Sequence, residues 1–194
     1  FSIIAGEAMA YSSTKVREIL LFSSVAQAGI AVLVFVNGFT GLAFMFVALN
    51  ATSKVALFLI VNHTVGKLGT DEVKDLKGLF VNNKVVGAAF TVIILSLLGL
   101  PMFAGFVVKM GILEQLFLNG SYFFPALILL SSVIEGVYFI KLLVKLWYTK
   151  HDVPSVKFEL PLAYLVVVIA VILVVFGLWM EPLQEQIALL GGIL

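Results

Sequence analysis

Cysteine is absent from this sequence of 194 residues, and histidine occurs only at His63 and His151. Without cysteine the chain can form no disulfide and can hold no cysteine-ligated iron–sulfur cluster or CxxC redox pair. The sequence also offers no nucleophile–base–orienter set, no cluster of metal ligands and no phosphate-binding loop. We therefore expect no metal, no cofactor and no catalytic residues in this chain. Any electron transfer associated with it must take place in another subunit.

Charge is scarce as well. Charged residues make up 12% of the chain and hydrophobic residues 62%, whereas a soluble domain carries about 25% charged residues. The mean hydropathy is +1.17. So little polar surface cannot cover a soluble globule, so the solvent for most of this chain must be the lipid bilayer. The net charge of +1 gives no reason to expect a nucleic-acid partner.

The hydrophobic residues gather in segments of membrane-spanning length, for which roughly 20 apolar residues are needed. Turn signals at 37–38 and 119–121 separate neighbouring segments. We predict an all-α, polytopic membrane protein, with 1–194 forming one transmembrane domain. The five full spans are predicted at 19–36, 39–65, 85–118, 122–145 and 160–180. Residues 1–11 are interpreted as the end of a truncated first helix, so the chain is expected to be a fragment of a longer protein.

The basic residues are confined to alternate loops, on one side of the predicted membrane. They are Lys15, Arg17, Lys67, Lys74, Lys77, Lys84, Lys150 and Lys157, with Lys141 and Lys145 near a helix end on the same side. The opposite loops, around 37 and 119, carry no basic residue. By the positive-inside rule the basic side is cytoplasmic, which predicts the plasma membrane of a prokaryote. The segment 66–84 is then a cytoplasmic amphipathic connection.

Two lysines remain inside the spans. Lys54 lies fifteen residues into the segment 39–65, or about 22 Å along a helix, which is close to the membrane midplane. Lys109 follows Gly99, Pro101 and Gly105 in the segment 85–118. That segment is too long for one straight span, and its proline and glycines predict a helix broken near Pro101. Broken helices inside membranes mark ion pathways in transporters.

Other polar residues accompany these lysines. Glu135 is the one acid in the middle of a complete span, so it is either an ion-pair partner of the lysines or a proton relay. Asn50 shares a helix face with Lys54. His63, near a helix end, is either an interfacial hydrogen-bonding group or a relay. Removal from water disfavours the charged form of an amine, so buried lysines can exchange protons near neutral pH. The sequence thus predicts a proton path through Lys54, Lys109, Glu135, Asn50 and His63.

Two acids are weaker candidates. Glu7 lies in the truncated first helix, and Glu114 lies a turn past Lys109, toward the outer surface.

Four motifs, in order and spacing, resemble the antiporter-like subunits of respiratory complex I, of Mrp-type cation/proton antiporters and of membrane-bound hydrogenases. They are Gly99-Leu-Pro101-x3-Gly105-Phe106-x2-Lys109, the stretch 17–29, Asn50-x3-Lys54-Val-Ala-Leu-Phe58, and the connection 75–79. The resemblance covers roughly 3–148. It implies the C-terminal half of a subunit of about fourteen spans, with Lys54 as the central relay lysine and Lys109 as the terminal one. Asn50 stands where the family has histidine, and Gln27 where many members do.

Three functions stay open from the sequence. The first is translocation of protons, with sodium as the alternative ion, within a redox-driven respiratory or hydrogenase-type complex, whose partners are antiporter-like and iron–sulfur subunits. The second is an Mrp-type cation/proton antiporter without redox partners. The third is a non-conducting structural subunit. Retention of both Lys54 and Lys109 argues against the third, because an inert subunit has little reason to keep charges that hinder insertion.

Overall fold

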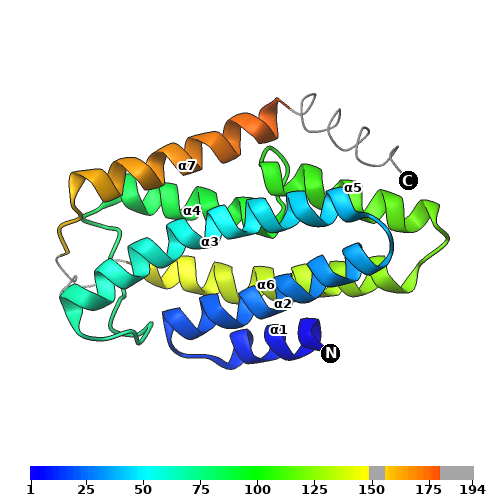
Figure 1. Cartoon of the computed structure of the whole chain (residues 1–194). Helices are drawn as coiled ribbons and strands as arrows, with labels where there is room; N and C mark the ends of the chain where they lie inside the picture. The colour runs from blue at the N-terminus through cyan, green and yellow to red at the C-terminus, as the bar shows by residue number, and fades with distance from the viewer. Residues whose placement is uncertain (149–155, 180–194) are drawn as a thin grey trace.

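The computed structural model describes residues 1–148 and 156–179, which form seven α-helices and no strand (Figure 1). The helices are α1 (Ser2–Ser12), α2 (Val16–Val36), α3 (Thr40–Leu68), α4 (Lys84–Leu98), α5 (Ala104–Leu118), α6 (Phe123–Trp147) and α7 (Leu160–Leu178). Two sequence predictions fall partly outside the described residues: the placement of Lys150 on the basic side, and the last residue, Met180, of the final predicted span. The all-α polytopic fold class is confirmed.

Four helices are each long and apolar enough to cross a membrane alone, namely α2, α3, α6 and α7. Their ends agree with the predicted spans within three residues. Hydropathy places the start of α2 too late because the first turn of this helix contains Arg17 and Glu18. It places the end of α3 too early for the same reason, since Lys67 lies in the last turn of α3.

The remaining predicted span, 85–118, is broken where the sequence predicts. The helices α4 and α5 have 15 residues each, about 22 Å, so together they cross the bilayer and neither does so alone. Pro101 lies in the turn between them. Gly99 ends α4 with φ +73°, and Met102 has φ +79°, a left-handed conformation that is uncommon for a residue with a side chain. The break is therefore a sharp, strained turn rather than a bend of a continuous helix.

Small residues let the segments around this break approach closely. A Cβ atom on Gly105 would overlap the carbonyl oxygen of Ser96, so glycine allows α5 to begin against the last turn of α4. On the other side α7 crosses the break at Gly177, where an added Cβ would overlap the backbone of Met102 and Phe103. The irregular backbone between α4 and α5 is thus covered by α7.

The loops alternate between the two ends of the bundle, and the ends that carry the basic residues lie together (Figure 1). The loop before α2 pairs with the connection after α3: the amide of Val16 donates to the carbonyl of Asp71 at 2.9 Å, and the amide of Val73 donates to the carbonyl of Thr14 at 3.0 Å. We call this end the basic side. In the connection 69–83 the buried residues are apolar, while Lys74 is exposed.

The helices are arranged so that α6 lies next to α1, α2, α4 and α5, while α3 packs on α2, α4 and α5. Large apolar side chains remain exposed along the outer faces of the long helices, for example Val133 on α6 at 65% and Val171 on α7 at 54%. Such faces suit lipid contact. The inner faces of α2, α3, α5 and α6 meet around a group of buried polar side chains.

Candidate functional site

Buried charges lie at half the length of two spanning helices. Lys54 is fourteen residues from either end of α3, and Glu135 is twelve residues from either end of α6. Gln27 is close to the middle of α2. The exposed fraction is 6% for Lys54, 7% for Lys109 and 0% for Glu135. A charged group at such a depth costs several kcal/mol unless protein groups or water compensate it.

Glu135 and Lys109 form the central pair. The Lys109 Nζ atom lies 3.2 Å from Glu135 Oε2. The other carboxylate oxygen, Oε1, accepts a hydrogen bond of 2.7 Å from the side-chain amide of Gln27. Glu135 is therefore held from two sides, by α5 and by α2. Glu135 is thus an ion-pair partner of Lys109, which is one of the two roles that the sequence left open for it. Its action as a proton relay is a proposal.

The broken helix supplies a further acceptor to Lys109. The lysine side chain passes over Gly99, where an added Cβ would lie 2.8 Å from its Cδ atom. Its Nζ atom donates to the carbonyl oxygen of Leu98 at 3.3 Å and to the hydroxyl of Ser132 at 3.3 Å. The Leu98 carbonyl belongs to the last turn of α4, where carbonyl groups have no partner within the helix and carry partial negative charge. The break thus helps to hold a cation in the membrane.

Lys54 sits one helical turn away from this pair. Its Nζ atom donates to the hydroxyl of Ser23 and, at 3.4 Å, to the carbonyl of Leu20. It also lies 5.1 Å from the centroid of the Phe139 ring. Ser23 precedes Gln27 by four residues on α2, and Phe139 follows Glu135 by four on α6, so each pair shares a helix face. Within the described residues no direct ion pair joins Lys54 to an acid.

Asn50 lies beside Lys109 across a small void. Its Nδ2 atom donates to the carbonyl of Phe46 at 2.8 Å, while its Oδ1 atom is buried without a partner in the described part of the chain. Asn50, Ser53, Ser96 and Lys109 line a void of about 10 Å³. That is near the smallest space that can hold one water molecule. A single water there would join Asn50 to the terminal lysine.

The structure does not bring His63 into this group. His63 lies nine residues beyond Lys54 on α3, about 13 Å along the helix. Its Nε2 atom lies 3.0 Å from the carbonyl of Lys157, and its ring stacks on Phe158 with centroids 5.3 Å apart. It therefore bridges α3 to the segment before α7. Glu114 is exposed toward the end of α5, as the sequence suggests.

Sequence reasoning missed several members of the buried group. These are Ser23 and Gln27 on α2, Ser131 and Tyr138 on α6, and Glu7 on α1, which the sequence ranked only as a weaker candidate. Glu7 is 1% exposed and accepts a hydrogen bond of 2.6 Å from the Ser131 hydroxyl. Helical spacing is the signal that could have found them, because Ser131, Glu135 and Tyr138 stand at positions i, i+4 and i+7 of one face. No group of three metal-ligating side chains gathers anywhere in the described residues.

These features define the class of protein. It is a polytopic α-helical membrane protein in which one broken and three continuous spans enclose a row of ionisable and hydrogen-bonding side chains at mid-membrane depth. Such buried charges in membrane spans mark ion pathways and proton relays.

The comparisons with known proteins identify the family. Residues 1–135 match the family described as NADH:quinone oxidoreductase/Mrp antiporter, transmembrane. The chain belongs to this family. It is 31% identical to NAD(P)H-quinone oxidoreductase subunit 2, chloroplastic, of Mesostigma viride, over 82% of this chain and 32% of the relative. It is 26% identical to NADH-quinone oxidoreductase subunit N 2 of Chloroherpeton thalassium, over 99% of this chain and 40% of the relative.

Solved structures share the fold. Respiratory complex I from Thermus thermophilus contains a chain that is 25% identical, with a TM-score of 0.79 over 93% of this chain and 42% of that one. The Mrp complex from Dietzia sp. contains a chain that is 19% identical, with a TM-score of 0.86 over 96% of this chain and 44% of that one. Both are subunits of multi-subunit membrane complexes. The chain spans about a third to two fifths of the length of the curated relatives it matches.

Proposed function

We propose that this chain moves protons through Lys54, Glu135 and Lys109 as part of a membrane subunit of a redox-driven complex. The observation that carries the proposal is the placement of two buried lysines on either side of Glu135 at mid-membrane depth. Glu135 holds Lys109 directly, and Lys54 lies one turn away through Ser23 and Phe139. A proton can pass along such a row by short transfers between side chains and intervening water.

The redox-driven version is favoured over the exchanger by the curated relatives, since those compared above are subunits of quinone oxidoreductases. In this version the described site takes part only in ion movement, and the electrons move in iron–sulfur subunits of the same assembly. We further propose that other antiporter-like subunits adjoin the chain in the membrane. The Mrp-type antiporter without redox partners is the second candidate, since the matched family includes it.

We also propose the orientation and the membrane. Among the described residues, the lysines and the arginine outside the buried group gather on the basic side, so the positive-inside rule places this side in the cytoplasm. For a prokaryotic respiratory complex the membrane is then the plasma membrane. Protons would exchange with the cytoplasm at the loop before α2 and the connection after α3.

The test is ion movement by the intact assembly reconstituted into vesicles, followed with a pH-sensitive dye inside the vesicles. Lys109→Ala is expected to abolish or strongly reduce proton movement while the assembly stays intact. Full pumping by an assembled Lys109→Ala variant would remove the basis for the proposal and leave the non-conducting structural subunit. Purification in gentle detergent, with identification of subunits and iron content, separates the other two candidates. Stoichiometric iron–sulfur partners support the redox complex, whereas small hydrophobic partners without iron support the exchanger.

A further inference from the structure

Glu7 is a second buried acid that the path through Lys54, Glu135 and Lys109 does not use. Its helix α1 packs on α2 and α6, and its Oε1 atom accepts the hydrogen bond from Ser131. Its Oε2 atom is buried and has no partner among the described residues. A buried carboxylate oxygen without a hydrogen bond is costly, because the carboxylate has lost its water and gained nothing in exchange. The Oε2 atom of Glu7 therefore needs either a hydrogen bond from a water molecule or a bound proton to offset this cost.

Tyr138 on α6 is a second buried side chain with a polar atom. Its side chain is 3% exposed, and its hydroxyl is buried without a partner in the described part of the chain. Ser131, which donates to Glu7, and Glu135 stand on the same face of α6 as Tyr138, seven and three residues before it. Tyr138 follows Glu135 by three residues, so it stands on the same face of α6 and on the side nearer the basic end. A hydroxyl group can accept a proton and donate one at the same time.

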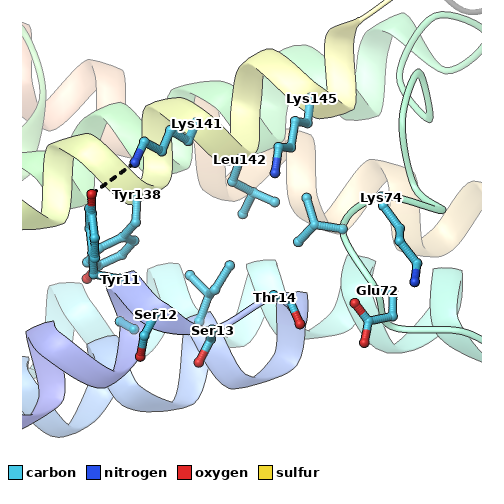
Figure 2. Close-up of a pocket in the computed structure, with 13 residues that line it drawn as sticks. Tyr11, Ser12, Ser13, Thr14, Glu72, Lys74, Tyr138, Lys141, Leu142 and Lys145 are labelled. Carbon is cyan, nitrogen blue, oxygen red and sulfur yellow. Dashed lines mark hydrogen bonds between the residues drawn. The ribbon is translucent and has the colours of Figure 1, made fainter.

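A cavity leads from the basic side to Tyr138. Its volume is about 600 Å³, and it lies where the ends of α1 and α6 meet the start of α2 and the connection after α3. Figure 2 shows Tyr138 beside Tyr11 and Lys141 at one end of this cavity and Glu72 and Lys74 at the other. The hydroxyls of Ser12, Ser13 and Thr14 line it between these ends. Polar groups in this number and a space of this size suit several water molecules.

Lys141 contacts Tyr11 at the end of the cavity that Tyr138 lines. Its Nζ atom lies 4.4 Å from the centroid of the Tyr11 ring and donates to the Tyr11 hydroxyl at 3.3 Å (Figure 2). This contact joins α1 to α6 at the cavity. Tyr138 thus lines the cavity and shares a face of α6 with Glu135 and with Ser131, the donor to Glu7.

We propose that Tyr138 and Glu7 form a proton-access branch that connects the cavity on the basic side to Glu135. The branch rests on the proposed function, because it has a purpose only if Glu135 exchanges protons. In each transfer the Tyr138 hydroxyl gives its proton to the Glu7 carboxylate and takes one from a hydronium ion in the cavity, which leaves a neutral tyrosine and a water molecule. Glu7 then passes its proton toward Glu135, one turn from Ser131 on α6. The charge delivered to the buried group is one proton.

The first test is proton movement by the reconstituted intact assembly carrying Glu7→Gln or Tyr138→Phe. Either change is expected to lower the initial rate roughly tenfold or more, since a positioned proton-transfer group usually contributes at least that much. Matched controls are Glu114→Gln and Tyr122→Phe, which change an exposed acid and an exposed tyrosine. Rates within twofold of wild type in assembled Glu7→Gln and Tyr138→Phe would overturn the branch.

Lys109→Ala, measured alongside, separates the two proposals. If Lys109→Ala is inactive while Glu7→Gln and Tyr138→Phe work at full rate, the branch is wrong and the lysine path stands. If Lys109→Ala is also fully active, the proposed function itself fails.

The second test does not depend on activity and covers the case in which a variant assembles poorly. Because residues 1–194 contain no cysteine, Tyr138→Cys introduces the one thiol of this stretch, and its labelling is read on the subunit that carries this stretch, against the same preparation without the substitution. A membrane-impermeant thiol reagent added on the basic side is expected to label it, because thiolates react only where water reaches them. Val133→Cys, at mid-span on the exposed face of α6, is expected to stay unlabelled. No labelling of Tyr138→Cys would show that the cavity does not reach this position and would overturn the branch.

Discussion

Glu135 and Lys109 are separated by 3.2 Å in the middle of the membrane, although they stand on different helices and 26 residues apart in the chain. The lysine reaches the acid from the helix just after the break, and the acid sits at half the length of α6. Removal of either residue leaves the other charge without its ion-pair partner in a low-dielectric interior, which costs several kcal/mol. Stability and proton transfer are therefore linked at this pair.

The first prediction separates these two roles. Lys109→Met leaves Glu135 buried with only Gln27 as a partner, so we expect a loss of about 3–5 kcal/mol in stability. The double variant Lys109→Met/Glu135→Leu removes both charges and is expected to regain most of this loss. Thermal unfolding of the purified assembly checks the stabilities. Both variants are expected to be inactive in proton movement, and an active double variant would contradict the proposed path.

The second prediction concerns the central lysine. Lys54→Ala is expected to reduce proton movement as strongly as Lys109→Ala, since it removes the amine that contacts both Ser23 and Phe139. Lys74→Ala is the matched control, because Lys74 is an exposed lysine of the connection on the basic side. Vesicle assays of both variants make the comparison. Equal damage by the two substitutions would show that the loss comes from charge in general rather than from the buried position.

The third prediction concerns Gln27, which donates to Glu135 at 2.7 Å. Gln27→Leu keeps the volume of the side chain but removes this donor, so Glu135 loses one of its two partners. We expect a destabilisation of about 1–3 kcal/mol and a slower proton transfer, because the buried Oε1 atom of Glu135 then has no hydrogen-bond donor. Gln115→Leu, at the far end of α5, is the control. An unchanged rate in Gln27→Leu would mean that water replaces the amide.

The fourth prediction concerns the broken helix. Gly105→Ala places a Cβ atom against the carbonyl of Ser96 and forces α5 away from α4. We expect a loss of roughly 1–3 kcal/mol, typical of overpacking, together with reduced activity as Lys109 moves from Leu98. Gly66→Ala near the end of α3 meets nothing within 4 Å and is expected to be neutral or stabilising by up to about 1 kcal/mol. Thermal unfolding of both variants measures the difference.

Much of this architecture could be read from the sequence, because lipid imposes simple rules. Span lengths, the break at Pro101 and the alternation of basic loops follow from hydropathy, proline chemistry and charge. The partners of the buried charges could not be read in the same way. Pairing of Glu135 with Lys109 rather than Lys54 depends on how α5 leans on α6, and no local pattern encodes that. Asn50 lies beside Lys109 across the small void, whereas His63 lies near the end of α3, at Lys157 and Phe158.

Glu7 shows a different limit of sequence reasoning. Its helix α1 has only 11 residues, so length alone gives no reason to place an acid there inside the membrane. What identifies it is contact with Ser131 from a helix more than a hundred positions away. Polar residues at helical spacing on α6 would have indicated a buried face, but they do not say which helix covers it.

The crossing of α7 over the break at Gly177 has a consequence of its own. The turn between α4 and α5 exposes backbone groups that lipid chains cannot solvate, so something must insulate them. The helix α7 carries no motif and no charge, yet it supplies this insulation, and only a residue without a side chain lets it come near enough. A larger residue at position 177 would push α7 away from the turn between α4 and α5. Lipid could then reach the backbone of this turn, or ions could leak past it. The helix α7, which carries no charged residue, thus shields the break between α4 and α5 from lipid.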